Sequence, residues 1–145
     1  MSLVGKRVFV TGGSRGIGLE IAKRIARDGA KVAIAAKTAE PNPKLPGTIF
    51  TAAKEIEAAG GQALPLVTDI RDEQALAASV NEAATKFGGL DILINNAAIS
   101  SVGNVEANTS DDWAKSFNIN VIGIARTSRN ALPLLRKSKS AAIVN

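Results

Sequence analysis

A glycine-rich stretch near the N-terminus, Thr-Gly-Gly-Ser-Arg-Gly-Ile-Gly at residues 11–18, constrains the fold more than any other part of the sequence. It follows an apolar run at residues 7–10, Arg-Val-Phe-Val, whose length and β-branched and aromatic content are typical of a buried parallel strand. After it, Ile17, Ile21 and Ile25 recur every four residues, which predicts a helix with one apolar stripe. The stretch is therefore predicted to join a strand to a helix.

A turn between a strand and a helix is suited to bind an anion, because the first N–H groups of a helix have no partner within it. A side chain at Gly12 or Gly16 would hold the backbone away from a phosphate, and Gly18 lets the helix pack closely on the strand. This context favours nucleotide binding over a purely structural turn. The candidate phosphate-binding residues are Gly12, Gly13, Ser14, Arg15, Gly16, Ile17 and Gly18.

Strand and helix patterns alternate along the rest of the chain. Strand-like runs lie at residues 31–36, 63–67, 90–94 and 140–145, and helical patterns begin at residues 49, 72 and 111. The long helix that begins at residue 111 is predicted to bury a stripe formed by Trp113, Phe117, Val121, Ile124 and Leu132. The alternation predicts an α/β fold, a doubly wound parallel sheet of the Rossmann type with about five strands. We expect one domain over residues 1–145, with later strands missing at its C-terminal end.

The composition excludes several classes of protein. The chain has no cysteine and no histidine, and its carboxylates do not cluster, so no disulfide, thiol catalysis or metal site is expected. Its net charge of +5 favours polyanionic partners such as nucleic acid or a phosphorylated cofactor. No apolar run is long enough to span a membrane, and the N-terminus lacks the pattern of a signal peptide. We therefore expect a cytoplasmic location and no membrane partner.

The residues after the second predicted strand indicate which dinucleotide is preferred. An acidic residue at this position would bind a ribose 2′-hydroxyl, whereas a cation suits a 2′-phosphate. This chain has Ala36 and Lys37 there, and Lys37 with Arg15 would supply two positive charges. The pattern favours NADP over NAD. Glu40, in the proline-containing loop that follows, is an alternative partner for the ribose.

The glycine spacing Thr-Gly-x-x-x-Gly-x-Gly, an aspartate after the third predicted strand and Asn-Asn-Ala after the fourth resemble the short-chain dehydrogenases/reductases over the whole chain. The resemblance implies that Asp69 binds the adenine amino group and that the backbone of Ile70 binds the adenine ring. It also implies that Asn96 contacts the adenine ribose, whereas Asn95 braces the sheet.

The resemblance also identifies a catalytic candidate. Trp113 is followed seven residues later by Asn120, which matches the family's Asn that helps to hold a water in a proton relay; Asn118 does not match. The alternative for Asn120 is a local hydrogen bond within a helix. The family's catalytic Ser, Tyr and Lys would lie beyond Asn145, and the chain contains no tyrosine.

The predicted parent activity is NADP(H)-dependent hydride transfer to or from a small-molecule carbonyl or secondary alcohol, and the 145-residue chain alone is expected to be inactive. The alternative is a non-catalytic nucleotide-binding module that is complete as written. Nucleic-acid binding is disfavoured because the cations after residue 125 lie near a helix C-terminus, where they complement its dipole, and no aromatic residues are interleaved with them. The wide apolar stripe of the long helix that begins at residue 111 suggests a homo-oligomer when the protein is full length.

Overall fold

Parallel strands form the centre of the computed structural model, which describes residues 2–43, 45–101 and 103–145. The strands are β1 (Arg7–Thr11), β2 (Lys31–Ala36), β3 (Gln62–Val67), β4 (Ile92–Asn95) and β5 (Ala142–Val144). Within the described residues they make one sheet in the order β3-β2-β1-β4-β5. Since β2 and β4 flank β1 on opposite sides, the strand order switches at the carboxyl ends of β1 and β4, where α/β sheets bind ligands.

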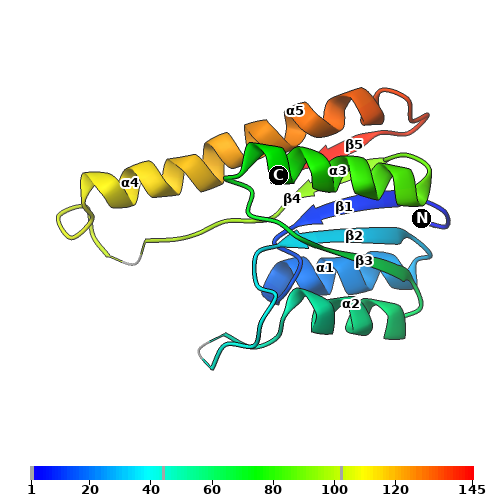
Figure 1. Ribbon diagram of the computed structural model, residues 1–145, viewed down its shortest axis with the longest axis horizontal. Coiled ribbons are helices and arrows are strands. Elements are labelled where there is room, and N and C mark those ends of the chain that lie inside the picture. The colour runs from blue at the N-terminus through cyan, green and yellow to red at the C-terminus, as the bar shows by residue number, and fades with distance from the viewer. Residues whose placement is uncertain (1, 44, 102) are drawn as a thin grey trace.

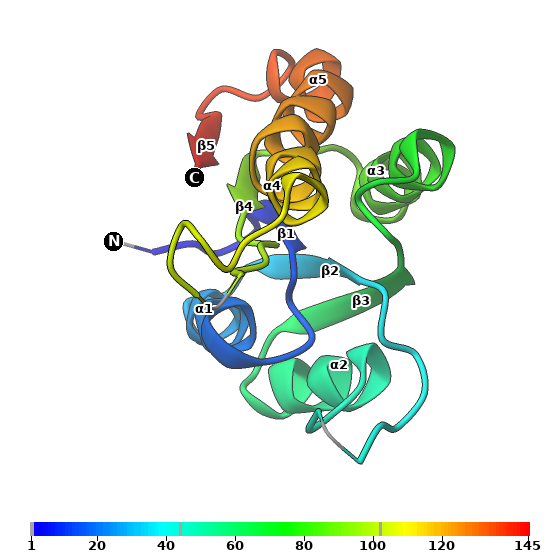
Figure 2. The ribbon, with the colours of Figure 1, turned by 90° about the vertical axis from the view of Figure 1, so that its left-hand side faces the viewer.

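Helices cover both faces of this sheet. They are α1 (Gly16–Arg27), α2 (Ile49–Ala58), α3 (Glu73–Phe87), α4 (Ser110–Phe117) and α5 (Gly123–Leu135), with a π-helical turn, η1 (Asn118–Ile122), between the last two. Figures 1 and 2 show α1 and α2 on one face and α3 with α5 on the other. Each face of the sheet has its own hydrophobic core, and alternate residues of β1 point into one or the other. Val8 and Val10 pack toward α1 and α2, whereas Phe9 packs toward α3 and α5. The predicted α/β Rossmann fold is confirmed.

Most predicted elements occur at or near their expected positions. Pro65 lies inside β3, which pairs only with β2 among the described strands and is therefore an edge strand that tolerates the missing N–H group. The fourth strand is shorter than predicted, since Leu90 and Asp91 precede β4. The long helix predicted from residue 111 contains the π-helical turn, after which α5 continues past Pro133 to Leu135.

The apolar stripe predicted for this long helix is wrong. Trp113 and Phe117 are 50% and 56% exposed, and Val121 and Leu132 are exposed as well. The face that packs against the sheet consists of buried residues at four-residue spacing, namely Ile119, Gly123, Thr127, Ala131 and Leu135. Small residues at three of these positions let the helix approach closely, and a Cβ at Gly123 would lie 2.7 Å from Cδ1 of Ile70.

The stripe predicted for the first helix is correct only in part. Ala22 and Ala26 are buried in the core under β1 and β2, and Ile21 and Ile25 pack against that core. Ile17, in contrast, is 76% exposed, and in the first turn of α1 it is Gly18 that is buried. Across the part of the chain that the structure describes, no helix has the length and apolar character needed to cross a membrane.

Candidate nucleotide-binding site

A cleft of about 250 Å³ opens at the carboxyl ends of the strands. The turns that follow β1, β2, β3 and β4 meet there, on the side of the sheet past which α4 extends in Figure 1. The cleft is lined by seven of the residues singled out in the sequence: Gly12, Ser14, Arg15, Lys37, Asp69, Ile70 and Asn96. Residues that lie up to 84 positions apart in the chain are therefore brought to one end of the sheet.

The turn after β1 leaves the N-terminus of α1 available to a ligand. No side chain caps α1, whereas Thr48, Asp72 and Thr109 cap α2, α3 and α4 with their oxygen atoms. The backbone of Gly12 has a φ of +70°, a left-handed conformation that favours glycine. A Cβ on Gly18 would lie 2.4 Å from the carbonyl oxygen of Gly12, so α1 can pack this closely only without a side chain there.

The turn after β4 is hydrogen-bonded to the turn after β1. The side chain of Thr11 accepts from the backbone N–H groups of Asn96 and Ala97 at 3.1 and 3.0 Å. In return, Nδ2 of Asn96 donates to the carbonyl oxygens of Thr11 and Gly12, both at 3.1 Å. Nδ2 of Asn95 donates to Asn145 at 2.8 Å. Both asparagines thus brace the sheet ends, and Asn96 does so while it lines the cleft.

Three cations and one carboxylate give the cleft its charge. Arg71 donates to both carboxylate oxygens of Asp69, and this hydrogen-bonded pairing, reinforced by the charge of Lys37, lowers the pKa of Asp69 below its usual value. Nη2 of Arg15 donates to the carbonyl oxygen of Gly47 at 3.2 Å, which links the glycine-rich turn to the loop before α2. The net positive charge of the cleft is suited to a phosphorylated ligand.

Asn120 lies beside the cleft instead of in it. Its Oδ1 accepts from the backbone N–H of Ile99 at 2.9 Å, and its Nδ2 donates to the carbonyl oxygen of Ile99 at 2.8 Å. It lines a neighbouring hollow with Trp113. Asn118, which lies five residues after Trp113, has a different partner: its Oδ1 accepts from Nη1 of Arg126 at 2.8 Å. The amide of Asn120 therefore holds the segment that follows β4.

A family model described as short chain dehydrogenase matches residues 6–145. The chain belongs to this family. Short-chain dehydrogenases are oxidoreductases that bind nicotinamide cofactors, and the predicted family membership is confirmed. A curated relative, hydroxysteroid dehydrogenase-like protein 2 of Homo sapiens, is 52% identical over 143 residues, which is 99% of this chain and 34% of the relative. The chain thus spans about a third of the length of the curated relatives it matches.

Solved structures of short-chain dehydrogenases share the fold. One from Mycobacterium thermoresistibile is 52% identical, with a TM-score of 0.93 over 98% of this chain and 51% of that one. One from Burkholderia cenocepacia in complex with NADP is 41% identical, with a TM-score of 0.80 over 93% and 53% of the two chains. One from Mycobacterium paratuberculosis bound to NAD is 26% identical, with a TM-score of 0.88 over 99% and 55%.

Not every predicted binding residue of this short-chain dehydrogenase lines the cleft. Gly13, Gly16, Ile17 and Gly18 do not border it. Gly13 is instead buried against β2, and a Cβ there would lie 2.6 Å from Cγ2 of Ile34. Ile17 points to solvent.

Other charged residues differ from their expected places. Glu40 is exposed and does not line the cleft. Arg71 was not predicted from the sequence as a residue of the site. Its position two residues after Asp69, in a turn that follows a strand, could have indicated that its guanidinium pairs with the Asp69 carboxylate. Among the described residues, no group of three or more histidine, cysteine, aspartate or glutamate side chains is placed to hold a metal ion.

Proposed function

We propose that this chain is the cofactor-binding part of an NADP(H)-dependent short-chain dehydrogenase that transfers a hydride to or from a small carbonyl compound or secondary alcohol. The observation that carries the proposal is that the turn leading into the uncapped helix α1, with Gly12, Ser14 and Arg15, converges with Lys37 and Asp69 on one cleft. Bound NADP would supply the hydride-transfer chemistry, while residues of this chain bind and orient it. Asn120, held by Ile99, is the residue of this chain proposed for the proton relay.

The chemistry of the cleft supports particular contacts with this cofactor. The free N–H groups at the start of α1 suit the pyrophosphate, and the cations Arg15 and Lys37 suit the ribose 2′-phosphate. Asp69 and Ile70, in the turn after β3, suit the adenine, and Asn96 the adenine ribose. The complex of the Burkholderia cenocepacia relative with NADP supports this cofactor, whereas the NAD complex of the more distant relative shows that the fold itself accommodates both.

Direct titration tests the proposed cofactor site. We expect NADPH to bind saturably to the chain, with a smaller dissociation constant than NADH, as measured by the change in nucleotide fluorescence or by quenching of the single tryptophan, Trp113. The intact mass is determined on the same sample. Absence of saturable binding of either nucleotide would contradict the proposal.

Replacing Lys37 by glutamate is expected to reverse the cofactor preference. The substitution removes a cation from the proposed 2′-phosphate subsite and supplies a carboxylate for a ribose 2′-hydroxyl. Loss of one charge-assisted hydrogen bond weakens NADPH binding by at least about tenfold, while NADH binding is retained or improved. The control is Lys54→Glu, the same charge change at an exposed position of α2. Equal losses for NADPH and NADH would contradict a 2′-phosphate role for Lys37.

A non-catalytic nucleotide-binding module is the second candidate, favoured by the absence of tyrosine from these 145 residues. The two proposals agree on cofactor binding and differ in chemistry. Oxidation of NADPH by a panel of carbonyl compounds, with the protein that contains this chain, separates them. Turnover supports the dehydrogenase, and tight binding without turnover supports the module.

The exposed apolar face of the long helix supports a homo-oligomer. Trp113, Phe117 and Val121 follow one another at four-residue spacing, so they lie on one side of α4 and η1, where all three are exposed. We expect light scattering to give a mass above that of the monomer, and Phe117→Lys to lower it by placing a charge within the apolar contact. A monomeric mass of the unsubstituted protein at micromolar concentration would contradict this proposal.

A further inference from the structure

The pair formed by Asp69 and Arg71 is the only ion pair among the described residues whose two side chains both line the cleft. Nε of Arg71 donates to both carboxylate oxygens of Asp69 at 3.0 Å, and Nη2 donates to Oδ2 at 2.5 Å. The backbone N–H of Arg71 also donates to Oδ1 at 3.0 Å. One residue thus makes four hydrogen-bond contacts with a single carboxylate.

These contacts leave the carboxylate little freedom. A guanidinium is a planar, rigid group, and a two-point contact with a carboxylate sets both the position and the plane of the carboxylate. The short connection adds to the constraint, because the Asp69 side chain also accepts from the backbone two residues later in an Asx turn. Asp69 is therefore held in one orientation before any ligand enters the cleft.

The residue between the two charged groups adds a second type of hydrogen-bonding group. The turn that contains Asp69 and Arg71 also places Ile70 in the cleft lining. A fixed carboxylate acceptor beside a backbone donor matches a purine edge that carries an amino group next to a ring nitrogen acceptor. In the proposed function this edge is that of adenine, so the inference rests on that proposal.

We propose that Arg71 is a positioning residue that fixes Asp69 for recognition of the amino group of the cofactor's base. Arg71 acts through the carboxylate and makes the site selective for a base that donates a hydrogen bond at this position. If Arg71 only attracted the phosphates of the cofactor, it would strengthen the binding of every dinucleotide by the same factor, whatever the base.

A base analogue separates these two roles. Reduced nicotinamide hypoxanthine dinucleotide phosphate differs from NADPH at the base, where a carbonyl oxygen replaces the amino group and the neighbouring ring nitrogen carries a hydrogen. An acceptor then faces the Asp69 carboxylate, and a donor faces the backbone donor of Ile70, which is the same in all variants of Arg71. The readout is the ratio of the two dissociation constants, measured by fluorescence titration of the full chain. We expect the unsubstituted chain to bind NADPH at least about tenfold more tightly than the analogue, the value of one hydrogen bond to a charged group.

Two substitutions of Arg71 and one control complete the test. Arg71→Ala is expected to reduce the ratio by at least about threefold, and Arg71→Lys, which keeps the charge but not the planar two-point contact, is expected to give an intermediate ratio. Arg129→Ala removes a guanidinium that is paired with Glu73 on α3, outside the cleft, and is expected to leave the ratio unchanged. Arg71→Lys retains a long cationic side chain, so it keeps the test valid if the alanine variant folds poorly.

The possible outcomes distinguish this inference from the proposed function. If Arg71→Ala weakens both nucleotides by the same factor and the ratio stays at its original value, Arg71 contributes only general attraction and the inference is wrong. If the unsubstituted chain binds both nucleotides equally well, Asp69 does not recognise the amino group of the base, and the inference is also wrong. If the chain binds neither nucleotide, the proposed function itself fails.

Discussion

Replacing Gly12 by alanine is expected to weaken NADPH binding by about a hundredfold, which corresponds to about 2.8 kcal/mol. The new Cβ would lie 2.8 Å from Cα of Ala97 and 2.9 Å from Nδ2 of Asn96, so the turns after β1 and β4 must separate. That movement breaks the hydrogen bonds from Asn96 to the carbonyl oxygens of Thr11 and Gly12 and shifts the N-terminus of α1 away from the proposed pyrophosphate position.

Gly5 provides a matched control for the backbone strain. Its φ of +74° is close to the +70° of Gly12, so an alanine suffers similar strain at both positions. No atom lies within 4 Å of a Cβ built on Gly5, and Gly5 precedes β1 at the opposite end of the sheet from the cleft. We expect Gly5→Ala to lower the thermal midpoint modestly and to leave the NADPH dissociation constant unchanged. Similar binding by Gly12→Ala and Gly5→Ala would contradict the proposed role of the turn.

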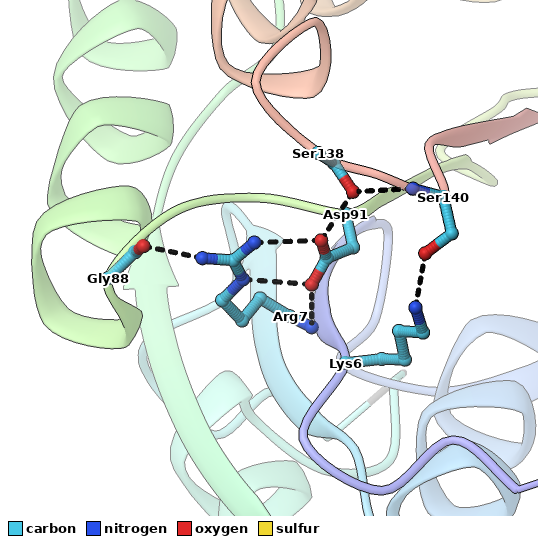
Figure 3. Close-up of polar contacts among 6 residues, drawn as sticks. All are labelled: Lys6, Arg7, Gly88, Asp91, Ser138 and Ser140. Atoms are coloured by element: carbon cyan, nitrogen blue, oxygen red, sulfur yellow. Dashed lines mark hydrogen bonds and ion pairs between the residues drawn. The ribbon is translucent and has the colours of Figure 1, made fainter.

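Replacing Asp91 by alanine is expected to destabilise the protein by about 3 kcal/mol, because it leaves Arg7 unpaired. Figure 3 shows the cluster around this pair. The Asp91 carboxylate accepts from Nε and Nη2 of Arg7 at 2.8 and 2.7 Å and from Oγ of Ser138 at 2.6 Å, and its side chain is only 9% exposed. Nη1 of Arg7 in turn donates to the carbonyl oxygen of Gly88. The cluster thereby joins the start of β1 to the turns before β4 and β5.

Urea unfolding followed by circular dichroism measures this effect, and the pair formed by Glu73 and Arg129 provides the control. Those two side chains are both more than half exposed, so Glu73→Ala is expected to cost less than about 1 kcal/mol. A loss of stability for Asp91→Ala no larger than that for Glu73→Ala would show that the cluster does not hold the three segments together.

The dependence of stability on pH provides a second readout of the same cluster. Hydrogen bonds from Arg7 and Ser138 hold the pKa of Asp91 well below its usual range in the folded state. Ionised Asp91 therefore stabilises the fold fully above the unfolded pKa of about 3.9, and this contribution is lost as the pH falls from there toward the folded pKa. We expect the difference in unfolding free energy between the original protein and Asp91→Asn to shrink between pH 6 and pH 2. A constant difference would contradict this assignment.

Local sequence patterns predicted the α/β fold because they act over short distances. The glycine stretch at residues 11–18 joins β1 to α1 in the structure, as predicted, with Thr11 ending the strand and Gly16 beginning the helix. Strand β2 has the predicted bounds, residues 31–36, because a short apolar run between turn residues has few other conformations that bury it. The place of Lys37 at the cleft followed from the rule that parallel strands end at one edge.

Helix faces were predicted less well than helix positions. The sequence of the long helix carries large apolar residues on one side and small residues on the other. The side with the large residues was predicted to be the buried face. The structure buries the side with Gly123, Thr127 and Ala131 instead. Small residues allow the helix to pack closely against the sheet here. Which face is buried therefore depends on the distance between the helix and the sheet, and a local sequence pattern does not contain that distance.

The sequence by itself determined the order of strands and helices along the chain, the position of the candidate nucleotide-binding turn and the edge of the sheet to which the candidate residues belong. These follow from periodicity, glycine and proline stereochemistry and the parallel arrangement of the strands. Only the tertiary structure decided which charges pair. Arg7 meets Asp91 across 84 residues, and Arg71 turns back onto Asp69 although Lys37 is also present in the same cleft. Such pairings depend on distances of a few ångströms between side chains, which packing sets and the spacing of residues along the chain does not.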